Sequence, residues 1–203
     1  MYGVDKLKNA FVNSSLNIIT NSKECDEIEI KKLKYGLEGL YSFITKFSVI
    51  LIINMILGTT KEFILFHFSY ALVRAFGFGI HAKTNIGCWI TSSIVNIFIP
   101  QLIKRVIIDK YILIITGIIS SIIIIIFAPA DTKKRPLKNK HKRKQDKVLA
   151  IIVCITYLVI INYSNHYIIY CLTYALVFEA IMVNPITYII TKQSYNNYKK
   201  LNV

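Results

Sequence analysis

Six apolar stretches constrain the fold of this chain more than any other feature of its sequence. They cover residues 43–57, 63–80, 88–103, 111–129, 148–163 and 167–190. An α-helix needs about 20 apolar residues, with roughly 17 to 25 tolerated, to cross the hydrocarbon layer of a bilayer. Residues 111–129 meet that length, whereas 43–57 and 148–163 are short. The sequence therefore predicts an all-α, polytopic membrane helical bundle, with six spans or with four spans plus re-entrant or interfacial segments.

The basic residues predict how this bundle is oriented. The chain has 25 Lys and Arg against 11 Asp and Glu, a formal net charge of +14. With six spans, nineteen of the basic residues fall on one side of the membrane and four on the other. Because loops rich in Lys and Arg stay in the cytoplasm, we expect both termini, the basic loop 131–147 and the loop after residue 80 there. The charge lies beside apolar spans without interleaved aromatic residues, which argues against nucleic-acid binding.

The first 40 residues are predicted to be a separate membrane-surface region, ahead of a transmembrane domain over 41–190 and a cytoplasmic tail over 191–203. Two amphipathic helices are expected in it, with Glu27 and Lys31 as a supporting pair. They could lie flat on the bilayer or pack on the bundle or on a second subunit, which makes a homodimer one option. The apolar stripes that predict them are Val4, Leu7, Phe11 and Ile18, and Ile30, Leu33, Leu37 and Leu40.

A polar interruption within the apolar part of the chain holds a histidine and a cysteine. The segment from Arg74 to Cys88 reads R-A-F-G-F-G-I-H-A-K-T-N-I-G-C, with His81 seven residues before Cys88. A thiol becomes a strong nucleophile when a base takes its proton, and a paired His and Cys suit acyl transfer. The bland alternative is that the cysteine is a small apolar residue and the histidine a solvated one.

The helix must break if these two side chains are to meet. Seven residues of one helix span about 10.5 Å, whereas a nucleophile and its base need roughly 3 Å. Glycine makes a break inexpensive, and Gly77, Gly79 and Gly87 lie in this segment. We expect the helix from residue 63 to end near 78, His81 to lie on the loop, and Cys88 to open the next helix. Free N–H groups at that helix start would favour a thiolate and could hold an oxyanion.

Charged and polar neighbours add candidate site residues. Arg74 inside a span is costly and is usually functional or paired. It could hold a substrate carboxylate, orient the loop with His81 and Cys88, pair with Glu179 in the last span, or extend to the membrane edge. Gly79 is expected to shape the loop, and Asn85 could orient the imidazole. The four cysteines have no metal-ligand spacing, so neither a metal nor a cofactor is predicted.

At these residues the chain resembles the accessory gene regulator protein B (AgrB) family. The run R-x-x-x-x-G-x-H-A-x-x-x-x-x-C, from Arg74 to Cys88, is similar to the family signature, as is A-P-A-D-T-K-K-R-P-L from Ala128 to Leu137. Phe78 departs from the pattern, since many members have the first glycine of a Gly-Gly pair there. The resemblance implies a multi-pass cysteine endopeptidase of quorum sensing in the bacterial cell membrane.

The resemblance also implies a reaction and a partner. Cys88 would cleave an AgrD-like precursor peptide, with His81 as base and then acid, and hold the peptide as a thioester. A cysteine or serine of the peptide would then close a thiolactone or lactone ring. The basic loop, with Lys133, Lys134 and Arg135, would grip the acidic tail of the precursor, contact anionic lipid, or do both.

A non-enzymatic function is the alternative. In a small transporter or membrane assembly factor, Arg74 and Glu179 would line a pathway and Cys88 would be passive. Transporters usually show repeated halves with paired broken helices. This chain shows one glycine-broken segment, which favours the enzyme.

Overall fold

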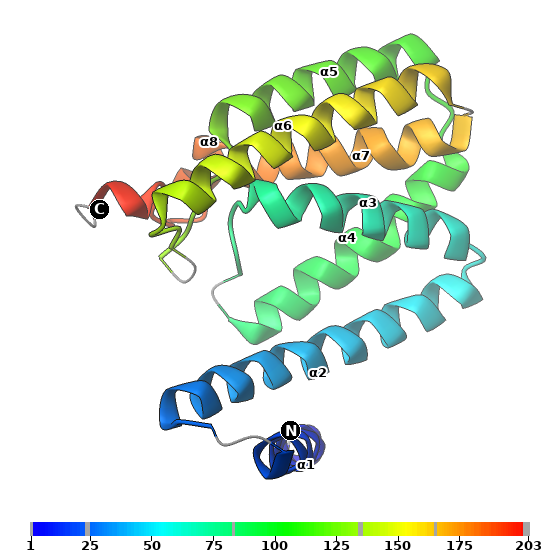
Figure 1. The fold of residues 1–203 in the computed structure, drawn as a ribbon. Coiled ribbons are helices and arrows are strands. Elements are labelled where there is room, and N and C mark those ends of the chain that lie inside the picture. Colours follow the sequence, from blue (N-terminus) through cyan, green and yellow to red (C-terminus); the bar gives the residue numbers. More distant parts are fainter. Residues whose placement is uncertain (1, 23–24, 83, 134–135, 165, 201–203) are drawn as a thin grey trace. The chain divides into compact units, whose positions relative to one another are not determined.

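The protein folds into α-helices joined by turns and loops (Figure 1). The computed structural model describes residues 2–22, 25–82, 84–133, 136–164 and 166–200. Within these ranges there is no β-strand; an isolated parallel bridge joins Phe78 to Ala130. The all-α prediction is confirmed. The elements are α1 (Tyr2–Ser22), α2 (Glu27–Ile56), α3 (Thr60–Gly77), α4 (Asn85–Arg105), α5 (Lys110–Phe127), α6 (Lys140–Tyr163), α7 (His166–Val183), α8 (Pro185–Ile190) and the 3-10 turn Asn197–Lys200.

The chain divides into two compact units, residues 1–53 and residues 54–203. The first contains α1 and most of α2. The predicted Glu27–Lys31 pair is confirmed, with 3.8 Å between charged atoms. The boundary expected at residue 40 falls inside α2, because the amphipathic helix continues without a break into the apolar stretch after it. Leu7 and Ile18 of the first apolar stripe are 67% and 69% exposed, whereas Phe11 is partly buried and its ring packs against Tyr41 of α2.

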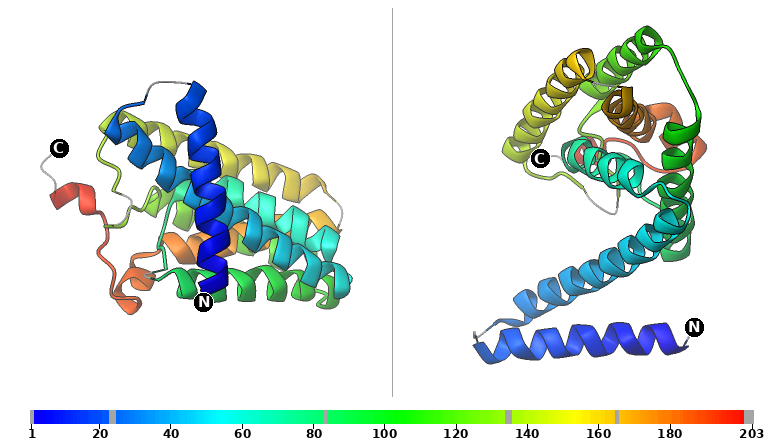
Figure 2. Two further views of the ribbon diagram at one scale, coloured as in Figure 1. Left: turned by 90° about the horizontal axis from the view of Figure 1, so that it is seen from below. Right: turned by 90° about the vertical axis from the view of Figure 1, so that its right-hand side faces the viewer.

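In the second unit, α7 is the central helix. It packs against α3, α4, α5, α6 and α8, and the view along the helices in Figure 2 (right) shows α3, α5 and α6 around it. A helix enclosed in this way must be apolar or small on every face. Its fully buried residues include Tyr170, Cys171, Ala175, Leu176, Glu179 and Val183.

The outer helices present apolar faces to their surroundings. On α5 the buried face carries small or aliphatic residues, and the exposed face is almost all isoleucine. An exposed surface of this kind suits lipid and not water. The exposed isoleucines are Ile112, Ile115, Ile118, Ile119, Ile122 and Ile126.

Among the described residues, four helices are long and apolar enough to cross a membrane: α2, α4 from Ile86, α5 and α6. The two apolar stretches that were short in the sequence, 43–57 and 148–163, belong to helices of 30 and 24 residues. They gain length from polar residues before the apolar run. The apolar part of α7 (Tyr167–Val183) is shorter, and α3, which carries Lys61, Glu62 and Arg74, is not among the four. The chain is thus a membrane protein.

Candidate active site

The predicted helix break lies between α3 and α4. Helix α3 ends at Gly77, His81 lies in the connecting loop, and α4 begins at Asn85. Gly79 has a φ of 79°, in the left-handed region that glycine adopts at little cost. A side chain there would meet Arg74 and the backbone of Met182. Gly79 therefore permits both the turn and its close packing.

Phe78 adopts a conformation that usually favours glycine. Its φ is 66°, and this is the position at which the sequence departs from the Gly-Gly pattern. Such a backbone costs a non-glycine residue about 1–3 kcal/mol. The phenylalanine side chain is 5% exposed, and burying it offsets that cost by about 1.5–3 kcal/mol. Packing of the buried phenylalanine thus stabilises a turn that glycine would adopt without strain.

The start of α4 differs from the prediction that Cys88 would open it. Thr84 is the N-cap, and its side chain accepts a hydrogen bond from the Gly87 N–H at 3.0 Å. The Cys88 N–H donates to the Thr84 carbonyl, also at 3.0 Å. Cys88 is therefore the fourth residue of the helix, and Gly87 lies in the first turn instead of at a break. Because both amides already have acceptors, they are not the oxyanion donors that the sequence suggested.

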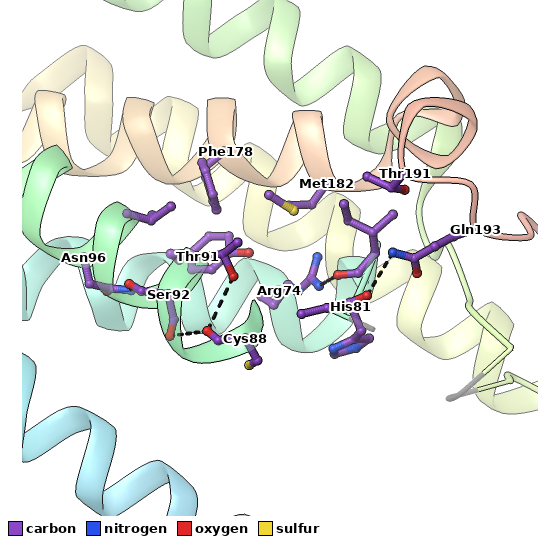
Figure 3. Close-up of a pocket in the computed structure, with 14 residues that line it drawn as sticks. Arg74, His81, Cys88, Thr91, Ser92, Asn96, Phe178, Met182, Thr191 and Gln193 are labelled. Atoms are coloured by element: carbon purple, nitrogen blue, oxygen red, sulfur yellow. Dashed lines mark hydrogen bonds between the residues drawn. The ribbon is translucent and has the colours of Figure 1, made fainter. Parts of the chain in front are cut away.

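Cys88 and His81 line the same cavity, of about 440 Å³. Both side chains are partly buried. Figure 3 shows the Cys88 Sγ, from the first turn of α4, and the His81 imidazole, from the loop, directed to the same lower side of the view. The other lining residues are Tyr70, Arg74, Ile80, Ala82, Thr91, Ser92, Val95, Asn96, Phe178, Met182, Thr191 and Gln193.

Arg74 connects the loop to the central helix. Its guanidinium lies 3.4 Å from a carboxylate oxygen of Glu179 on α7 and donates a hydrogen bond to the Ile80 carbonyl. The Glu179 side chain is fully buried, and that of Arg74 is 18% exposed. Of the roles considered for Arg74, these contacts favour orienting the loop and pairing with Glu179. The residue immediately before His81 is thereby fixed.

The two motifs of the sequence meet in space. The Ala130 N–H donates to the Gly77 carbonyl at 3.0 Å, and the Gly79 N–H donates to the Ala130 carbonyl at 2.8 Å. Asp131 is fully buried, and its carboxylate accepts from the backbone N–H groups of Leu137 and Asn197 at 3.1 and 2.7 Å. The Ala128–Leu137 motif therefore braces the turn that precedes His81.

The structure describes only part of the remaining predicted site residues. Asn85 opens α4, and its side chain is outside the described part of the structure. Lys133 is exposed, while Lys134 and Arg135 lie outside the described residues.

Sequence reasoning missed polar residues of the cavity wall. Ser92 and Asn96 follow Cys88 at intervals of four, which places all three on one face of α4. That spacing in an otherwise apolar helix was a readable signal. Gln193 donates to the His81 carbonyl at 2.9 Å, and no local pattern could have indicated it, because 112 residues separate the two.

Gly77→Ala is expected to destabilise the protein by about 1–3 kcal/mol, as overpacking of a filled site does. The new Cβ would collide with the buried Glu179 carboxylate, which cannot withdraw without disturbing its pair with Arg74. Thermal unfolding in detergent micelles measures the change.

Gly36→Ala is the matched control. Gly36 lies within α2, and a Cβ added there would meet nothing within 4 Å. Alanine at this position should therefore stabilise the helix by up to about 1 kcal/mol. Equal stability of the Gly77→Ala variant and the unchanged protein would contradict the packing described for Glu179.

Comparison with known proteins identifies relatives along most of the chain. The family model Accessory gene regulator B matches residues 5–183. An AgrB-like protein of Clostridium acetobutylicum is 30% identical over 174 residues, 84% of this chain and 82% of that protein. An AgrB-like protein of Listeria monocytogenes is 28% identical over 178 residues, 86% of each. The accessory gene regulator protein B of Staphylococcus carnosus is 31% identical over 128 residues, 63% of this chain and 66% of that protein. No solved structure matches the chain.

Proposed function

Because the chain belongs to the accessory gene regulator B family, we propose that it is a membrane cysteine endopeptidase that cleaves and cyclises an AgrD-like precursor peptide. Family membership supports a role in accessory gene regulator quorum sensing. The observation that carries the finer proposal is the cavity lined by both Cys88 and His81. A nucleophile and a base at one cavity are the minimum that acyl transfer requires.

The first step is attack on the precursor. The Cys88 sulfur adds to the backbone carbonyl at the start of the C-terminal tail while His81 takes the thiol proton. As the C–N bond breaks, His81 gives this proton to the leaving amine. The products are the free C-terminal tail and a thioester between Cys88 and the remaining peptide.

The second step is ring closure. A cysteine thiol or serine hydroxyl within the bound peptide attacks the thioester carbonyl, and Cys88 leaves as a thiolate that regains a proton. The product is a thiolactone or a lactone. Exchange of one thioester for another is close to neutral in free energy, so the closure of the thiolactone ring needs no ATP.

The cavity walls suit an intermediate that water would destroy. Phe178 and Met182 of α7 face the site from the side opposite Cys88 (Figure 3), and Ile80 and Val95 add further apolar surface. Excluding water from a thioester prevents its hydrolysis and favours attack by the peptide's own nucleophile.

The basic loop is proposed to guide the precursor. Residues 131–147 carry nine Lys and Arg, and of these Lys133 is among those exposed. An acidic peptide tail would be attracted to this charge, as would anionic lipid. We place this loop, both termini and the catalytic loop in the cytoplasm, from the distribution of charge along the sequence.

The proposal is tested by trapping the acyl-enzyme. The full chain is produced with a precursor whose ring-closing residue is changed to alanine, so the thioester cannot be resolved by cyclisation. The intact mass of the protein should rise by the mass of the peptide without its tail, less one water, and neutral hydroxylamine should remove the addition.

Variants of Cys88 test whether its sulfur forms the bond to the trapped peptide. Cys88→Ser should give an ester that resists neutral hydroxylamine, and Cys88→Ala should give no addition. A passive Cys88, as in a transporter, predicts no addition in any variant. An addition that persists in Cys88→Ala would also refute the mechanism.

A further inference from the structure

We propose that the segment after α8, residues 191–198, is part of the active site and that Gln193 is a positioning residue for His81. This inference rests on the proposed function, because it assigns a role relative to the catalytic histidine. The segment lies beyond the part of the chain that matches the family, which ends at residue 183.

Gln193 contacts the loop of His81 directly. The Gln193 side-chain amide donates to the His81 carbonyl at 2.9 Å, and the Gln193 backbone N–H donates to the Tyr188 carbonyl at the same distance. The glutamine is thus anchored to the end of α8 while its amide reaches the catalytic loop. It fixes the main chain at the residue whose ring must meet the thiol.

The neighbouring residue of the loop is held from other directions. The Ile80 N–H donates to the Met182 carbonyl at 3.0 Å, and the Ile80 carbonyl accepts from Arg74. These contacts fix the loop as far as Ile80. The hydrogen bond from Gln193 carries the restraint one residue further, to His81.

The segment 191–198 is itself well anchored. The Asn197 N–H donates to the buried Asp131 carboxylate at 2.7 Å, and Asn197 is 9% exposed. The Ser194 hydroxyl donates to the Asn197 side-chain oxygen at 2.6 Å. Such a segment can transmit a restraint, because its own position is set by hydrogen bonds on both sides of Gln193.

Aromatic contacts add to this anchoring. The Tyr195 ring packs edge-on against Tyr188, with 4.9 Å between centroids, and the Arg143 guanidinium lies 3.7 Å from the centre of the Tyr198 ring. Burial raises the pKa of the Tyr195 hydroxyl, and this hydroxyl donates to the Phe127 carbonyl at 3.3 Å.

The segment 191–198 also forms part of the cavity surface. Thr191 and Gln193 both line the cavity that contains Cys88 and His81 (Figure 3). A peptide bound there would lie against this wall. The segment therefore both completes the cavity and restrains the base within it.

The test exploits the direction of the hydrogen bond. Gln193→Glu keeps the size of the side chain but replaces the donor by a carboxylate, which repels the His81 carbonyl. Because misplacing a catalytic group by about 1 Å can cost roughly 100-fold in rate, we expect kcat for tail release to fall about 10- to 100-fold. KM for the precursor should change less than kcat, since the rest of the cavity wall is kept.

Gln193→Lys provides the rescue. Its ammonium can donate to the same carbonyl, so kcat should recover to within about 5-fold of the unchanged protein, as expected when the one missing hydrogen bond is restored. The control is Asn162→Asp, the same change of amide to carboxylate at an exposed residue near the end of α6 that lies outside the basic loop and does not line the cavity. Its kcat should equal that of the unchanged protein.

The assay uses the full-length protein in lipid nanodiscs with a synthetic precursor, and it follows release of the C-terminal tail. If Cys88→Ala is inactive but Gln193→Glu has an unchanged kcat, the role of Gln193 is overturned and the proposed function stands. Equal losses in Gln193→Glu and Gln193→Lys would also overturn it, because they would reveal a need for the glutamine's shape and not for a donor. If Cys88→Ala cleaves as well as the unchanged protein, both proposals fail.

Discussion

Cys88→Ala is expected to abolish processing of the precursor. Alanine has no nucleophile, so neither the thioester nor the ring that forms from it can be made. Removing the nucleophile of a hydrolase costs about 10⁶-fold in kcat where the residues act as a unit, so the loss should exceed the range of a cell-based assay. Co-expression with the precursor, followed by mass spectrometry of cleaved tail and cyclic product, measures it.

Cys25→Ala is the matched control for this variant. Cys25 is also a partly buried cysteine outside any disulfide, but it does not line the cavity. Its removal should leave both products at the level of the unchanged protein. Cyclic product from Cys88→Ala in normal amount would show that the peptide bond is broken by another group.

His81→Ala is expected to lower tail cleavage by about 10²- to 10⁴-fold, the usual contribution of a positioned general acid–base. Two proton transfers fail at once, because the thiol loses its base and the leaving amine loses its acid. The effect should be smaller than that of Cys88→Ala, since the nucleophile is still present. Single-turnover cleavage of a synthetic precursor separates the two variants.

His141→Ala is the corresponding control. His141 is an exposed histidine in the first turn of α6, so the substitution removes an imidazole without touching the cavity. With the precursor at saturation it should retain the single-turnover cleavage rate of the unchanged protein, because the Lys and Arg of the basic loop are kept. A His81→Ala variant that cleaves at the normal rate would remove the histidine from the mechanism, while the thioester test would still decide the role of Cys88.

The helical class and the break between α3 and α4 could be predicted from the sequence. Apolar length predicted the helices, and the glycines between Arg74 and Cys88 predicted the turn. The predicted start of α4 was wrong, because the helix begins at Asn85 and not at Cys88. Threonine is a favoured N-cap, so Thr84 carried a signal for the correct start that the glycines and the cysteine obscured.

The tertiary contacts of the site could not be predicted in the same way. The hydrogen bond from Gln193 to His81 joins segments with no common pattern, and burial of Asp131 depends on how two distant loops pack. Arg74 and Glu179 could be proposed as partners only because two charges in apolar helices each need one. The contact of a charge inside an apolar helix can be predicted from the sequence, because such a charge needs a partner. A contact between ordinary polar groups can be found only from coordinates.

The Asp131 carboxylate joins segments of this chain that are distant in sequence, as a disulfide bond does in many secreted proteins. It accepts hydrogen bonds from the backbone N–H groups of Leu137 and Asn197. These bonds hold the basic loop and the 3-10 turn Asn197–Lys200 to the Ala128–Leu137 motif beside the loop of His81. Cross-links of sulfur form under oxidising conditions, and the same conditions would convert an exposed reactive thiol to sulfenic acid or a mixed disulfide. Hydrogen bonds between backbone N–H groups and a carboxylate are not oxidised or reduced. The four cysteines form no disulfide, so these segments are joined without a sulfur cross-link, which is compatible with the free thiol that the proposed mechanism needs at Cys88.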